Sequence, residues 1–248
     1  MSVMIRRSMW FALGLVGALS LACTGGAAGT TTDASAGGRD TADVENDQDV
    51  RGIYAVTWSD TVTVTLDLGG AVQTAQTDTS GVVTFTGPDG APLELDLAAW
   101  CADPGVNCPS EAWPARVAID EEAPATPSQF HTIQVSDADL GGERRAGLVD
   151  HALDTFLVGL DGGSGQSGNC GAVALSLAGG TFVYPVPADT APAEDPFAAG
   201  VAAPGGPNGI ADGQVALGWL GICAWPGLAV AATLRIDTPF EALRVGDL

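Results

Sequence analysis

The residues that could do chemistry in this chain are scattered and form no recognisable catalytic motif. The only two histidines, His131 and His151, do not make a spaced pair such as H-E-x-x-H, so a zinc site would have to be assembled from distant parts of the chain. The run Gly165-Gln166-Ser167-Gly168-Asn169 lacks the glycine that a serine nucleophile elbow requires two places after the serine. We therefore predict no catalytic residues and a protein that is not an enzyme.

Carboxylates are the most abundant candidate ligands. Three groups offer several oxygen atoms each, as calcium requires: Asp43-Glu45-Asp47-Asp49, Asp120-Glu121-Glu122 and Asp137-Asp139. The first group alternates like a calcium loop but lacks the central glycine and the final glutamate. We interpret all three groups as hydrated surface and predict no metal or cofactor, with weak calcium binding as the functional alternative.

Tryptophans supply the candidate binding surface. Trp100, Trp113 and Trp225 fall in predicted loops or turns, where an aromatic ring can stack on a sugar or a partner protein. The structural alternative is that these loop rings plug the open end of a β-domain. Trp58 and Trp219 fall on predicted strand faces with apolar neighbours, and we assign them to the core.

The composition excludes several function classes. The chain of 248 residues has a formal net charge of −21, with 30 acidic residues, nine arginines and no lysine. Lysine-based Schiff-base chemistry is therefore excluded. Nucleic-acid binding is excluded as well, because it requires clustered positive charge. Electrostatic attachment to an anionic lipid surface is equally disfavoured, because carboxylates are repelled from it.

Alternation of apolar and polar residues predicts strands along most of the chain. Five strands joined by short turns, between residues 52 and 97, predict an antiparallel meander. Further strands are predicted at residues 116–120, 130–136, 173–177, 181–184, 213–222 and 228–236. About ten short antiparallel strands are typical of a β-sandwich or an up-and-down, closed barrel, and alternation fits both architectures.

Three segments break this pattern. Residues 143–160 carry apolar side chains at three- and four-residue spacing, which favours one short helix. The glycine-rich residues 161–169 are predicted to be a flexible loop. Residues 185–211, rich in proline, alanine and glycine, are predicted to be a long surface excursion.

The beginning of the chain has the parts of a secretory signal. Arg6 and Arg7 precede the uncharged run Met9–Ala22, which is too short to span a bilayer. Cys23 follows that run directly. A cysteine directly after the predicted cleavage site resembles the signal of bacterial lipoproteins. That family usually carries leucine three residues before the cysteine, where this chain has Ser20.

The lipoprotein resemblance implies a location. It implies that residues 1–22 are removed, that Cys23 is lipidated, and that the acyl chains are the membrane partner. Thr24 after the cysteine is compatible with sorting to the outer membrane. Residues 23–50 are predicted to be the lipidated cysteine followed by a flexible acidic tether, and residues 51–248 a single β-domain.

The remaining four cysteines suggest two disulfides, because an exported chain meets an oxidising environment. Pro104-Gly105 favours a reversal that brings Cys101 and Cys108 within reach of each other. Cys170 begins one predicted strand and Cys223 ends another, as in neighbouring antiparallel strands. We predict the pairs Cys101–Cys108 and Cys170–Cys223.

Three functions remain open from the sequence. The first is a lipid-anchored β-domain of the bacterial cell envelope with a non-catalytic binding or structural role toward a protein or glycan. The second is a carboxylate-based secreted hydrolase of the polysaccharide class, because such carboxylate pairs come together only in space. The third is a small-ligand carrier, since Gly52-Ile53-Tyr54 is similar to the opening G-x-W of lipocalins, with Tyr54 in place of tryptophan.

Overall fold

The computed structural model describes residues 49–101, 109–126, 128–167, 170–186, 195–201, 205–225 and 228–248. These residues form an all-β protein with two very short helices. The elements in chain order are β1 (Gly52–Trp58), β2 (Val62–Leu68), β3 (Ala71–Thr77), β4 (Val82–Thr86), β5 (Pro92–Asp96), α1 (Leu97–Cys101), α2 (Pro109–Ala112), β6 (Arg116–Glu122), β7 (Phe130–Asp137), β8 (Gly141–Asp150), β9 (Thr155–Ser167), β10 (Cys170–Val183), β11 (Gly209–Trp225) and β12 (Leu228–Gly246). Within these ranges no helix is both long and apolar enough to cross a membrane.

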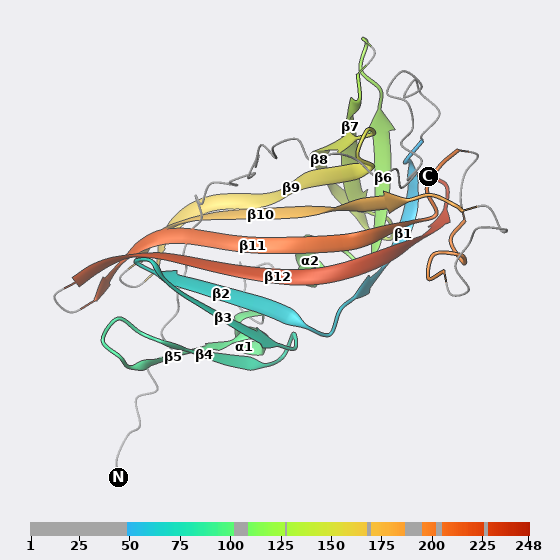
Figure 1. The fold of residues 1–248 in the computed structure, drawn as a ribbon. Coiled ribbons are helices and arrows are strands. Elements are labelled where there is room, and N and C mark those ends of the chain that lie inside the picture. The colour runs from blue at the N-terminus through green and yellow to red at the C-terminus, as the bar shows by residue number, and fades with distance from the viewer. Residues whose placement is uncertain are drawn as a thin grey trace, which may run out of the picture.

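Eight of the strands close into an antiparallel barrel (Figure 1). Their order is β1-β6-β7-β8-β9-β10-β11-β12, and β12 pairs back with β1. From β6 to β12 each strand pairs with the next one along the chain. The predicted all-β class is therefore confirmed. Of the two architectures that the alternation allowed, the chain adopts the closed barrel.

Two strands, β1 and β2, share one edge of β12, and the pairing with β1 closes the barrel. β1 pairs with residues 240–246 of β12, while β2 pairs with residues 232–237. Between them the Ser59 amide donates to the Pro239 carbonyl at 3.0 Å. β3 extends the sheet beyond β2, and β4 and β5 form a separate two-stranded sheet. The predicted five-strand meander is therefore wrong at two of its junctions, since β1 does not pair with β2 and β3 does not pair with β4.

Residues 143–160 form no helix, so that prediction is wrong. They belong to β8, a four-residue turn in which Asp154 has a φ of 55°, and β9. Val149 and Val158 point into the barrel and are fully buried, whereas Leu148 and Leu157 lie on the outer face, 55 % and 48 % exposed. Apolar residues on both faces of two strands produced the helix-like spacing.

The glycine-rich segment 161–169 is mostly strand, which corrects the predicted loop. β9 continues to Ser167, where it pairs with Cys170 of β10. The strands β9 to β12 have 13, 14, 17 and 19 residues and extend well beyond the shorter strands β6 and β7 (Figure 1). Glycine has no side chain to signal a period of two, but its backbone bonds across a ladder like any other.

Aromatic rings fill the barrel interior. Phe156 lies between Trp113 and Phe182, with centroid distances of 6.0 and 5.1 Å. The ring centroid of Trp113 is also 5.7 Å from that of Phe240, and the ring centroid of Tyr54 is 6.0 Å from that of Phe182. All five side chains are buried. Around these five rings the barrel interior is therefore filled by packed side chains.

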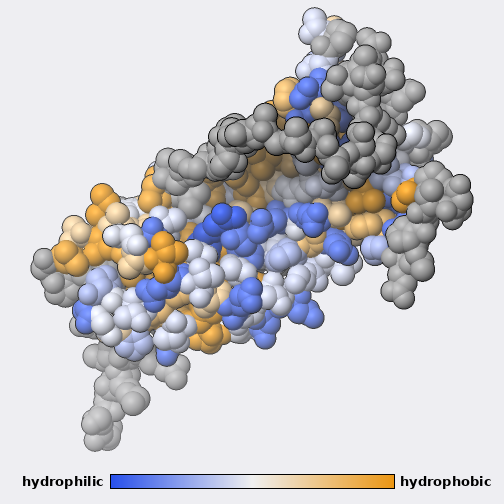
Figure 2. Space-filling model, viewed as in Figure 1, coloured by the Kyte–Doolittle hydropathy of each residue, from blue (hydrophilic) through white to orange (hydrophobic). Residues whose placement is uncertain are grey.

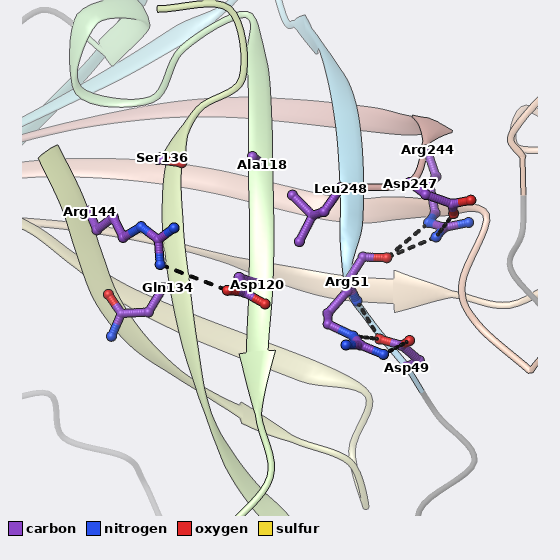
Figure 3. Close-up of a pocket in the computed structure, with 10 residues that line it drawn as sticks. All are labelled: Asp49, Arg51, Ala118, Asp120, Gln134, Ser136, Arg144, Arg244, Asp247 and Leu248. Atoms are coloured by element: carbon purple, nitrogen blue, oxygen red, sulfur yellow. Dashed lines mark hydrogen bonds and ion pairs between the residues drawn. The ribbon is translucent and has the colours of Figure 1, made fainter. Parts of the chain in front are cut away.

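Arg244 ties three segments together at one end of the barrel (Figure 3). It is only 2 % exposed. Its guanidinium donates to the Arg51 carbonyl at 2.8 and 3.2 Å and to the Val201 carbonyl at 2.7 Å, and it pairs with Asp247 at 2.7 Å. A buried charge is tolerated only when such acceptors surround it. Arg244 thus connects the residue before β1 with segment 195–201 and the end of the chain.

The substitution Gly52→Ala should lower the free energy of unfolding by about 2 kcal/mol. A Cβ at Gly52 would lie 2.4 Å from Arg244 Nε and would displace it from its acceptors. Gly246 lies in the same β1–β12 seam, and a Cβ there meets nothing within 4 Å. Gly246→Ala should therefore change the stability by less than about 0.5 kcal/mol. Urea unfolding measures both variants, and equal losses would contradict the role of Arg244.

Cys170 and Cys223 are directly opposite each other in β10 and β11 and are joined by a disulfide, which confirms that predicted pair. Replacing both cysteines by alanine should destabilise the fold by at most about 4 kcal/mol, because the bond closes a loop with a sequence separation of 53. Thermal unfolding of the oxidised chain and of the double variant measures this loss. An unchanged melting temperature would show that the bond adds no constraint beyond the ladder.

Candidate functional site

Three polar side chains meet inside the barrel at the end where β6 stops, β7 starts and β8 stops. Glu121 lies opposite Ile133, and His131 lies opposite Val149. Opposite residues of a ladder share one face, and residues two apart on a strand share it too. Ile133 and Val149 face the interior and are fully buried. The pleat therefore places Glu121, His131 and, directly after β8, His151 on the interior side.

The polar atoms of these three side chains converge. Glu121 Oε1 lies 2.5 Å from His131 Nδ1 and 2.7 Å from His151 Nε2. The two nitrogens are 3.2 Å apart. An ionised carboxylate only accepts, so both ring nitrogens carry the hydrogens in this arrangement. We call this group the His–His–Glu cluster.

The His–His–Glu cluster is almost closed to solvent. The side chains of Glu121, His131 and His151 are 8 %, 10 % and 5 % exposed. Burial raises the pKa of Glu121, but hydrogen bonds from His151, from the Val50 amide and from His131 outweigh it, so the pKa lies below its usual value. Glu121 is therefore a carboxylate anion at neutral pH.

The chain just before β1 holds the second oxygen of Glu121. The Val50 amide donates to Glu121 Oε2 at 3.1 Å. Val50 is fully buried, and its carbonyl accepts from the Tyr54 hydroxyl at 2.7 Å. The contact between Val50 and Glu121 joins residues that are 71 positions apart in the sequence. The carboxylate is thereby fixed in orientation, with Oε1 directed at the two imidazoles.

Two imidazole nitrogens and one carboxylate oxygen form a ligand set used by divalent transition metals. Among the described residues this is the group of histidine, cysteine and acidic side chains whose ligand atoms come close enough to hold such an ion. No metal site was predicted from the sequence, because the two histidines of the chain match no spacing motif. A different signal was present in the sequence. His131 is two residues before Ile133 and four before Val135, and Glu121 is two residues after Ile119, so each lies on the same face of its strand as core residues.

A groove of about 440 Å³ lies on the outer side of the same strands (Figure 3). Ala118 and Asp120 of β6 and Gln134 and Ser136 of β7 line its floor, and charged side chains surround it. These charges are already paired: Arg51 with Asp49 at 2.6 Å, Arg144 with Asp120 at 3.8 Å, and Arg244 with Asp247 at 2.7 Å. The groove therefore offers no concentration of one sign of charge.

The three acidic groups, for which weak calcium binding was the alternative to hydrated surface, are divided or engaged. Asp120 faces the outer groove while Glu121 faces the interior, so the 120–122 group is split between two faces. Asp137 accepts from the backbone amides of Asp139 and Leu140, and Asp139 pairs with Arg116. Asp49 pairs with Arg51, and the other acids of the first group lie outside the described residues.

The predicted tryptophan surface is wrong for Trp113. This residue is fully buried between Phe156 and Phe240, because the short helix α2 directs it into the barrel interior. The side chains of Trp100 and Trp225 lie outside what the structure describes, as do Cys23 and the predicted Cys101–Cys108 pair. Trp58 packs against the core at 5.6 Å from Phe240, as expected.

Apolar residues are exposed at the far end of the long strands (Figure 2). On the outer face, Ile222 near the end of β11 is 65 % exposed, and Val173 and Leu175 of β10 are 41 % and 39 % exposed. They lie toward the end that carries the Cys170–Cys223 disulfide, whereas Leu228 at the start of β12, 52 % exposed, is on the opposite face of the ladder. An exposed apolar face of this kind is suited to a macromolecule more than to a small polar ligand.

Comparisons with protein-family models, curated proteins and solved structures find no match to this chain.

The substitution Trp113→Ala should cost about 3–5 kcal/mol of stability, because it empties a fully buried, ring-lined site. Leu140→Ala is the matched control: Leu140 is 87 % exposed, and its truncation should cost less than about 0.5 kcal/mol. Urea unfolding followed by far-UV circular dichroism measures both. A small loss at Trp113 would return it to the role of an exposed binding residue.

Proposed function

We propose that this protein is a lipid-anchored β-barrel domain of a bacterial cell envelope, located at the outer membrane, with a non-catalytic binding role. The lipoprotein-like run that ends at Cys23 supports the anchor. The structural observation that supports an extracytoplasmic location is the Cys170–Cys223 disulfide, because such bonds persist in oxidising compartments. The predicted tether ended at residue 50, but Val50 is fully buried and its amide binds Glu121, so residues 24–48 serve as the tether between lipid and barrel.

The interior of the barrel favours a binding role over catalysis on a sugar chain. A glycosidase requires two carboxyl groups about 5–10 Å apart in a cleft that admits the substrate. Glu121, the interior carboxylate of the described barrel end, is held by two histidines and a backbone amide. The exposed apolar surface around Ile222 and Val173 is instead the kind of surface that contacts a partner protein.

A small-ligand carrier is the second candidate, and the barrel topology supports it. Eight antiparallel strands in a closed barrel are the architecture of lipocalins, and Gly52-Ile53-Tyr54 opens β1. A carrier needs an apolar cavity of a few hundred Å³. Tyr54, Trp113, Phe156 and Phe182 occupy the interior where such a cavity would lie. We therefore rank the carrier below the anchored binding domain.

Replacing Cys23 by alanine tests the anchor. The wild-type chain, produced in a bacterium that processes lipoproteins, should enter the detergent phase on phase separation and incorporate labelled palmitate at Cys23. The Cys23→Ala chain should incorporate none, because the alanine offers no sulfur to acylate. Cys101→Ser is the matched control, since it removes a cysteine of the domain and should leave partitioning unchanged. A wild-type protein that remains in the aqueous phase with residues 1–22 removed would contradict the proposal.

A further inference from the structure

We infer that Glu121, His131 and His151 form a binding site for one divalent transition-metal ion of the zinc class. The site lies inside the barrel, at the end where the chain enters β1. This inference does not depend on the lipid anchor, because all three ligands belong to the described barrel.

The spacing of the ligand atoms fits such an ion. The three atoms form a triangle with edges of 2.5, 2.7 and 3.2 Å. Ligand atoms about 2.0–2.1 Å from a tetrahedral zinc ion are about 3.3 Å apart. When the ion binds, the hydrogens of His131 Nδ1 and His151 Nε2 move to the other nitrogen of each ring, so that both rings stay neutral. The two carboxylate contacts then lengthen by about 0.8 and 0.6 Å. The ligand atoms are therefore already close to the spacing that the ion requires.

The surroundings hold the ligands in place before an ion arrives. Glu121 Oε2 accepts from the Val50 amide, which is the kind of outer contact that orients metal-binding carboxylates. The rings of His131 and His151 are edge to face, with centroids 4.4 Å apart. His151 Nδ1 is buried with no partner among the described residues, so this ring is held by packing and by its Nε2 contacts alone.

The donor types select the class of ion. Imidazole nitrogens suit zinc, copper, nickel and iron, whereas calcium and magnesium take oxygen ligands. Each imidazole binds as the neutral ring, and the single Glu121 carboxylate supplies one negative charge. Three protein ligands leave a fourth tetrahedral position for water. The acidic surface of the protein attracts cations in general but provides no nitrogen donors.

A bound ion would join four parts of the chain. Glu121 comes from β6, His131 from β7, and His151 from the turn after β8. Val50 joins them through Glu121 Oε2, and it directly precedes β1. Metal binding should therefore stabilise the barrel and fix the point at which the preceding residues reach it. This distinguishes the site from a surface cluster of acids, whose occupancy would leave the fold unchanged.

The test uses the full chain purified in detergent, freed of metal with EDTA and titrated with Zn²⁺ in the presence of excess Mg²⁺. We expect one Zn²⁺ per chain and a raised melting temperature. The chain has only two histidines, so both C2 proton resonances in the NMR spectrum report on this site. Both should shift on Zn²⁺ addition. Co²⁺ should give the visible absorption of a four-coordinate nitrogen–oxygen site.

Three variants assign the ligands. His131→Gln and His151→Gln each remove one nitrogen donor and should abolish one-to-one binding, while Glu121→Gln should weaken it by about 10-fold or more. Glu122→Gln is the matched control: it removes the same charge from the neighbouring exposed residue and should bind Zn²⁺ like the wild type. Circular dichroism confirms the fold of each variant.

Two results would overturn the inference. The first is Zn²⁺ binding that leaves both histidine resonances in place or persists in the two histidine variants, which would assign the ion to surface carboxylates. The second is no Zn²⁺ or Co²⁺ binding by the wild-type chain, which would make the cluster a hydrogen-bonded element of the core. If a histidine variant fails to fold, the wild-type NMR titration decides alone.

Discussion

The shared edge of β12 is the constraint on which this structure depends. Because β12 has 19 residues, β1 and β2 can pair end to end along it while β11 covers its other edge. The part paired with β1 closes the barrel, and the part paired with β2 carries the additional sheet. Closure removes the two exposed edges that an open sheet would present. It also defines an interior, so each residue on an inward pleat must be packed or paired.

The interior contains two different solutions to this requirement. Aromatic rings from β1, β9, β10 and β12 and from the residue after α2 fill one part of the interior by packing against one another. At one end, a carboxylate and two imidazoles take inward positions and satisfy one another. Burying such groups is costly unless hydrogen bonds or a metal ion compensate. The pairing of β1 with β6 brings the Val50 amide to Glu121 and completes the arrangement.

The sequence predicted the parts of the fold that depend on side-chain alternation. Strands such as Arg116–Glu122 and Phe130–Asp137 alternate clearly and were predicted to within a residue or two. Prediction failed where the period is hidden: residues 161–167 carry no apolar side chain that could show it, and residues 143–160 have apolar side chains on both faces. Partner choice also failed, since nothing local to β1 indicates that it pairs with residues 240–246.

The candidate site could not be predicted from spacing, because its ligands come from two strands and from the turn after a third, and they meet only through the ladder. Glu121 and His131 are ten residues apart, and His151 follows twenty residues later. The Cys170–Cys223 pair was predictable because each cysteine marked a strand end. The histidines carried the same kind of information, an inward position at a strand end, but identifying their partners required the register.

Amide hydrogen exchange across β1 tests barrel closure most directly. In the closed barrel, Ile53, Tyr54 and Ala55 are paired with β6 on one side and β12 on the other. All three of their amides should then be strongly protected. An open sheet with β1 at its edge would leave alternate amides of these residues to exchange rapidly, and that alternation would contradict the closed barrel and the interior that it creates.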